Sequence, residues 1–157
     1  MESNPIIRPG TIDDVLCLLE LIRELAVYEK APDEVTVTLE ETKNWGFGPH
    51  KIFDFFVAEE NGKVLGIALY YYKYSTWKGK CLFLEDIIVT ETHRRRGLGK
   101  LLFEAVARVA KEKKVQRMEW QVLEWNEPAI KFYEKYKANF DSEWINGKLT
   151  NIDLQGF

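Results

Sequence analysis

The stretch from Cys81 to Val89, CLFLEDIIV, constrains the fold most strongly, because it is an almost unbroken apolar run. A short run of this kind between turn residues is typical of a strand that is covered on both faces of its sheet. Two acids, Glu85 and Asp86, interrupt the run at its centre, where unpaired carboxylates are rare. The sequence therefore predicts a central strand that carries two carboxylates.

The remaining patterns alternate between helix and strand. Asn61-Gly62 is typical of a tight turn between two strands, and Thr11 with Asp14 resembles a capping box at the start of a helix. We expect helices over 11–31, 39–45, 98–113 and 126–136, strands over 5–9, 53–59, 63–73, 81–89 and 117–125, and a terminal hairpin that turns near 146–148. This order predicts an α/β (α+β) fold, in which helices flank a mixed sheet.

Composition limits the class of protein. A chain of 157 residues with 46% apolar residues predicts one domain over 1–157. The net charge of −3 argues against a general nucleic-acid binder, and two cysteines with two distant histidines predict no metal site. Since no apolar run approaches a membrane span and no signal pattern begins the chain, we expect a soluble cytoplasmic protein with no membrane partner.

Residues 92–106, THRRRGLGKLLFEAV, form a basic turn with two glycines before an amphipathic helix. The amides at a helix start and the helix dipole favour an anion, and glycine lets a phosphate approach the backbone. The alternative is a solvated basic helix start, as most short charged turns are. Neither the P-loop pattern nor the dinucleotide pattern GxGxxG fits these residues.

The pattern R-x-x-G-x-G at 94–99 resembles the coenzyme A pyrophosphate loop of the GNAT N-acetyltransferase superfamily. Segments such as FLEDIIV, EWNEPAIKFYEK and YSTWKGK are similar to the diamine (spermidine/spermine) and thialysine N-ε-acetyltransferases, and the resemblance runs from about residue 7 to 154. It implies a single GNAT-like domain, in which two parallel strands splay apart and bind acetyl-CoA, and it implies a homodimer.

The resemblance also implies which residues contact coenzyme A. Asn126 matches a coenzyme-contacting position, although capping of the following helix also explains an Asn there. The implied cofactor-binding residues are Ile87, Ile88, Val89, Arg94, Arg95, Arg96, Gly97, Leu98, Gly99, Lys100, Asn126 and Tyr133. Which arginine contacts which phosphate is left open by the sequence.

Two residues match the catalytic positions of the family. A carboxylate is needed because a lysine-like amine, with a pKa near 10.4, is almost entirely protonated at pH 7. Glu85 is the implied base and Tyr133 the implied acid for the departing thiolate. The structural alternatives are a strand carboxylate paired with Arg or Lys at position 85, and a core aromatic at position 133.

The substrate side matches less completely. Tyr28, Glu29 and Trp77, together with Glu85 and Asp86, correspond to substrate-binding positions, and a small primary amine is the implied substrate. Ser75 stands where polyamine enzymes have an acid, so a diamine, a polyamine and a lysine analogue such as thialysine remain open. The alternative functions are a non-catalytic acyl-CoA-binding or regulatory protein and, less favoured, a nucleic-acid-binding module.

Overall fold

The structure is a computed structural model that describes residues 4–157 as two compact units. The first unit, here called the sheet unit, ends at Gln121, and the second, the C-terminal unit, spans Val122–Phe157. Each unit has its own elements. The single domain expected over 1–157 stays a prediction.

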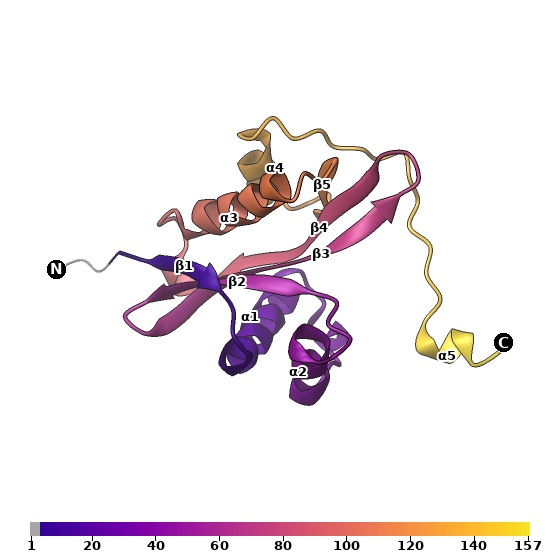
Figure 1. The fold of residues 1–157 in the computed structure, drawn as a ribbon, viewed down its shortest axis with the longest axis horizontal. Helices are drawn as coiled ribbons and strands as arrows, with labels where there is room; N and C mark the ends of the chain where they lie inside the picture. The colour runs from indigo at the N-terminus through magenta and orange to yellow at the C-terminus, as the bar shows by residue number, and fades with distance from the viewer. Residues whose placement is uncertain (1–3) are drawn as a thin grey trace. The chain divides into compact units, whose positions relative to one another are not determined.

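The sheet unit is built on five strands in the order β1-β2-β3-β4-β5 (Figure 1). Neighbours from β1 to β4 are antiparallel, and β4 and β5 are parallel, so the sheet is mixed as expected. The strands are β1 Ile6–Pro9, β2 Asp54–Glu60, β3 Lys63–Ser75, β4 Gly79–Val89 and β5 Arg117–Trp120.

Helices cover both faces of this sheet. Figure 1 shows α1, Val15–Tyr28, and α2, Leu39–Phe47, on one face, and α3, Leu98–Glu112, on the other. Gly66 in β3 has no room for a side chain, since a Cβ at this position would lie 2.9 Å from the carbonyl oxygen of Ile88 in β4 and 3.1 Å from a methyl of Leu102 in α3. Short 3-10 turns at Ile12–Asp14, Pro32–Glu34 and Glu91–His93 connect the elements.

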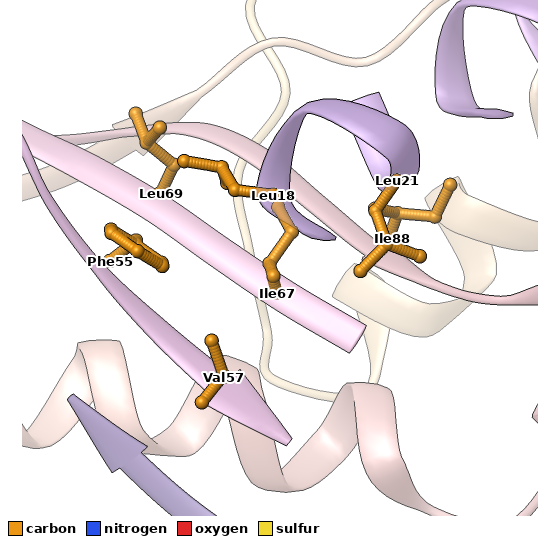
Figure 2. Close-up of a cluster of buried hydrophobic side chains, with 7 residues drawn as sticks. All are labelled: Leu18, Leu21, Phe55, Val57, Ile67, Leu69 and Ile88. Carbon is orange, nitrogen blue, oxygen red and sulfur yellow. The ribbon is translucent and has the colours of Figure 1, made fainter. Parts of the chain in front are cut away.

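A buried apolar cluster joins α1 to the three central strands (Figure 2). Removing these side chains from water is the main source of stability for the sheet unit. The cluster consists of Leu18, Leu21, Phe55, Val57, Ile67, Leu69 and Ile88. Its residue from β4 is Ile88, and Cys81, Leu82 and Leu84 of β4 are also buried, which confirms β4 as an interior strand of the sheet.

Two predicted local signals are confirmed. Asn61 and Gly62 take positive φ values of 54° and 76°, as the tight turn between β2 and β3 requires. Thr11 and Asp14 form the predicted capping box, and the Asp14 carboxylate also accepts bonds of 2.7 and 3.0 Å from the Arg8 guanidinium. Because Arg8 also binds Glu59 in β2 at 2.9 Å, this network ties the start of α1 to the sheet.

The C-terminal unit differs from the prediction at its end. It contains α4, Glu127–Glu134, as expected, but residues 138–150 form no strand, and a short helix, α5 Asn151–Leu154, follows. The predicted terminal hairpin is therefore wrong. A two-stranded hairpin is marginal by itself, and residues 122–157 contain no sheet for it to join.

Candidate functional site

The β3–β4 ladder contains a bulge at Glu85. Leu69 pairs with Asp86 and Tyr70 pairs with Leu84, so Glu85 has no partner residue in β3. A bulge re-aims side chains and disrupts the ladder locally, and bulges are frequent next to active sites. It places Glu85 and Asp86 at the point where the strand is least regular.

The same point is where β4 and β5 part. Their parallel pairing runs from Cys81 with Arg117 to Leu84 with Trp120 and ends there, although β4 continues to Val89. The predicted strand over 117–125 is correspondingly shorter, because β5 ends at Trp120. Past Leu84, β4 has no neighbour in β5, so its edge is open.

Backbone groups of Ile87 and Val89 face this open edge. The amide of Thr90 donates to Leu65 at 2.8 Å, so Thr90 and Ile88 point toward β3. Since successive residues of a strand point to opposite sides, Ile87 and Val89 point away from β3. The Val89 carbonyl accepts a 3.0 Å bond from Arg94 Nε, which agrees with this direction.

Glu85 is held by a residue that the sequence did not single out. The hydroxyl of Tyr71 in β3 donates to the Glu85 carboxylate at 3.0 Å, and the Tyr71 ring stacks on Phe83 with centroids 5.4 Å apart. Burial and the charge of Glu85 raise the pKa of Tyr71 to about 12, which keeps the hydroxyl protonated as a donor. The alternation of residues in YYYKY was the only available signal for this residue.

Asp86 is the more strongly perturbed of the two acids. Burial, and then the charges of Glu85 and Glu29, raise the pKa of Asp86 to about 6. Burial also raises the pKa of Glu29, which caps the end of α1. The structure thus brings three of the predicted substrate-side carboxylates into one electrostatic group.

Neither central acid is neutralised by a base. Within residues 4–157, Glu85 and Asp86 form no ion pair with Lys or Arg. The structural alternative for Glu85, a strand carboxylate paired with a basic side chain, is therefore wrong. Their negative charge is available for a ligand cation.

The turn after β4 exposes backbone amides. Gly97 is the N-cap of α3 with φ 81°, and no side chain caps this helix start. The first amides of α3 have no acceptor within the helix, and the helix dipole makes this end positive. A Cβ on Gly97 would meet no atom within 4 Å, and one on Gly99 would meet only a Val89 methyl at 4.0 Å. The turn has the room and the charge for a phosphate group.

The three arginines of this turn have different partners. Arg94 lies over the Tyr28 ring at 5.2 Å and pairs with Glu24 at 3.7 Å, and Arg96 binds both carboxylate oxygens of Glu60 at 3.0 and 2.7 Å. Arg95 is exposed, has φ 62°, and forms no hydrogen bond or ion pair within residues 4–157. Of the three, Arg95 has its charge least committed to the protein.

The other predicted residues lie elsewhere. Trp77 is 78% exposed in the β3–β4 turn, before β4 begins at Gly79, and the strand from Gly79 to Glu85 spans about 20 Å. Asn126 caps α4 and accepts from the Ala129 amide at 3.4 Å, while the Tyr133 ring contacts Phe132 within the same helix. Both belong to the C-terminal unit, and their proposed roles stay predictions, as does that of Trp77.

A pocket of about 600 Å³ lies beside Tyr71 in the sheet unit. Its lining residues are Lys51, Ile52, Phe53, Asp54, Leu69, Tyr71 and Tyr72. Within residues 4–157 no group of three or more Asp, Glu, His or Cys side chains is arranged to hold a metal ion. In the same part of the chain, no helix is both long and apolar enough to cross a bilayer.

Comparison with known proteins identifies the family. Residues 18–137 match the acetyltransferase (GNAT) family model, so the chain belongs to this family. Thialysine N-epsilon-acetyltransferase of Bos taurus is 38% identical over 141 residues, which cover 85% of this chain and 83% of the relative. Spermidine/spermine N(1)-acetyltransferase-like protein 1 of Homo sapiens is 33% identical over 134 residues, which cover 81% of this chain but 19% of the relative.

Solved structures confirm the fold. An integron cassette protein from the mobile metagenome of V. cholerae superposes with a TM-score of 0.78 at 24% identity, over 97% of this chain and 96% of that one. The family and its named relatives make the chain an N-acetyltransferase with the predicted α/β fold.

Proposed function

We propose that this enzyme transfers the acetyl group of acetyl-CoA to a primary amine of a small diamine, polyamine or lysine analogue. The amine attacks directly in a ternary complex. One observation carries the proposal. Glu85 and Asp86, which have no basic partner in the described residues, lie where β4 separates from β5, and β4 is followed by the start of α3, which contains glycine and has no side-chain cap.

The chain's residues fit acetyl-CoA in two places. The open edge of β4 at Ile87 and Val89 offers backbone groups to the amide-containing pantetheine arm. The amides at Gly97–Lys100 and the free charge of Arg95 suit the pyrophosphate. When bound, acetyl-CoA supplies the acetyl thioester that the amine attacks.

Glu85 is the proposed base that removes the proton from the substrate ammonium. A lysine-like amine is neutral in about one molecule in 2,500 at pH 7, which corresponds to a barrier of about 4.6 kcal/mol. We propose that Glu85 binds the ammonium and accepts its proton, directly or through a water, while Asp86 adds negative charge beside it. Tyr71 orients the Glu85 carboxylate through its 3.0 Å hydrogen bond.

The remaining roles are carried by the family resemblance. Tyr133 is proposed to protonate the departing thiolate, and Asn126 to contact coenzyme A from the start of α4. Tyr28, Glu29 and Trp77 are proposed to contact the amine. The relatives named for thialysine and spermidine/spermine acetylation support an amine acceptor.

We also propose that the enzyme is a cytoplasmic homodimer. Both cysteines, Cys17 and Cys81, are free thiols, which suits a reducing compartment. The large apolar side chains Trp144 and Phe157 of the C-terminal unit are 72% and 98% exposed, which suits burial against a second copy.

The test follows coenzyme A release at fixed acetyl-CoA over spermidine, spermine, putrescine, lysine, thialysine and an aminoglycoside. We expect turnover with at least one of these amines and a large loss in both Glu85→Gln and Tyr133→Phe. The exposed Tyr74→Phe variant serves as the control for loss of a hydroxyl. Acetyl-CoA binding without turnover of any amine would instead favour the non-catalytic, acyl-CoA-binding alternative.

A further inference from the structure

We propose that the pocket beside Tyr71 binds the α-amino and α-carboxylate groups of an amino acid whose side-chain amine is acetylated. Lys51 and Asp54 recognise these two charges. The inference rests on the proposed function and narrows it, because it selects an amino-acid acceptor over a diamine or polyamine.

The pocket is built from two segments of the sheet unit. Leu69, Tyr71 and Tyr72 come from β3, and residues 51–54 lead from α2 into β2. The second segment is anchored to α2: the Ile52 amide donates to the Trp45 carbonyl at 2.8 Å, and the Phe53 ring lies against Gly46, where a Cβ would come within 2.7 Å. The walls are therefore held by the fold.

Tyr71 connects this pocket to the proposed base. Its side chain lines the pocket, and its hydroxyl donates to Glu85 at 3.0 Å. An acceptor with its reacting amine at Glu85 therefore extends past Tyr71 into the pocket. The apolar side chains of Leu69 and Phe53 suit the methylene chain between the two ends of such a molecule.

The pocket lining also carries one positive and one negative group. Lys51 Nζ and Asp54 Oδ1 are 2.5 Å apart, and the two side chains are 48% and 43% exposed. An exposed pair of this kind contributes little to stability, and both groups remain accessible to a ligand.

The charges of this pair match those of an amino acid. The α-ammonium binds Asp54 and the α-carboxylate binds Lys51. The two charges of the ligand and the two of the protein then alternate in sign. A diamine keeps the ammonium that binds Asp54 but has no carboxylate for Lys51, so the Lys51 charge is left without a ligand anion and repels the ammonium beside it. The pocket thus discriminates by the presence of the carboxylate.

Two pairs of acceptors test this inference, because their members differ only in the α-carboxylate: L-lysine with cadaverine, and L-ornithine with putrescine. The measured quantity is kcat/KM for coenzyme A release. We expect the amino acid to be preferred in each pair, and Lys51→Gln to reduce that preference about fivefold. Lys63→Gln, at an exposed lysine of β3 outside the pocket, is the matched control and should leave the preference unchanged.

A charge reversal gives a result that misfolding cannot imitate. Lys51→Glu should increase kcat/KM for cadaverine while decreasing it for L-lysine. If wild type uses the decarboxylated acceptors as well as the amino acids, and neither Lys51 variant changes the ratio, the inference is overturned while the turnover itself upholds the proposed function. Absence of turnover with every amine, despite acetyl-CoA binding, would overturn the proposed function as well.

Discussion

The hydroxyl of Tyr71 donates a 3.0 Å hydrogen bond to Glu85, the residue that the bulge adds to β4. This contact links the middle of β3 to the proposed base across the most irregular point of the sheet. It also explains how a carboxylate without a basic partner keeps a defined orientation.

Tyr71→Phe removes this donor and retains the ring that stacks on Phe83. We expect kcat to fall about tenfold, because one hydrogen bond to a charged group is lost. The loss should fall on kcat while the Kd for acetyl-CoA stays unchanged, because the bond orients the Glu85 carboxylate. Tyr74→Phe, on the same strand, is the control, and an unchanged kcat in Tyr71→Phe would contradict the positioning role.

Asp86 should impose its own pH dependence. Its pKa, raised to about 6, means that its charge develops between pH 5 and 7. Because Glu85 is proposed to bind the ammonium and accept its proton within the complex, deprotonation of the amine adds no slope in this range, so log kcat/KM should rise with a slope near one below pH 6 and level off above it. In Asp86→Asn this rise should be absent. A bend near pH 6 that persists in this variant would assign the titration to another group.

Arg95 is predicted to contribute most to acetyl-CoA affinity among the three arginines of the turn. Arg94 and Arg96 already bind protein carboxylates, and Arg95 does not. Arg95→Gln should raise the Kd for acetyl-CoA about tenfold and weaken its dependence on salt. The control is Arg108→Gln, at an exposed position of α3, measured by isothermal titration. Equal Kd values for both variants would argue against a phosphate contact of Arg95.

The Arg8–Asp14 pair predicts how acid affects stability. The Arg8 guanidinium holds the pKa of Asp14 at about 2, below its ordinary 3.8. Because the folded pKa is lowered, the stabilisation is complete above pH 4 and is lost as pH falls through 2. Arg8→Met should therefore lower the free energy of unfolding by about 2 kcal/mol at pH 7, and the difference from wild type should shrink toward pH 2. Urea unfolding between pH 2 and pH 7 measures the stability difference between wild type and Arg8→Met. A difference that does not change with pH would indicate lost packing and not a lost ion pair.

Local signals predicted most of the fold of the sheet unit. The Asn61-Gly62 turn, the Thr11 capping box and the apolar run of β4 each depend on residues close together in the chain, and each was confirmed. The terminal hairpin was predicted wrongly because a turn signal near residue 147 does not supply the neighbouring strand that a hairpin needs.

The candidate site was only partly predictable for a related reason. The acids 85 and 86 were visible as exceptions in an apolar run, and the phosphate turn as a glycine and arginine pattern. Tyr71 was not, because its approach to Glu85 depends on the shifted pairing of two strands. The separate partners of Arg94, Arg95 and Arg96 depend in the same way on residues distant in sequence.

The bulge at Glu85 has a consequence for how this enzyme can evolve. It is set by the number of residues between two paired positions, so no single substitution removes it. Deleting Glu85 itself would restore a regular ladder in which Leu84 and Asp86 keep their partners in β3, but it would remove the proposed base together with the bulge. Substitutions at positions 85 and 86 can therefore change the acids themselves. The position of these residues in the sheet depends on the number of residues in β4, which only an insertion or deletion can alter.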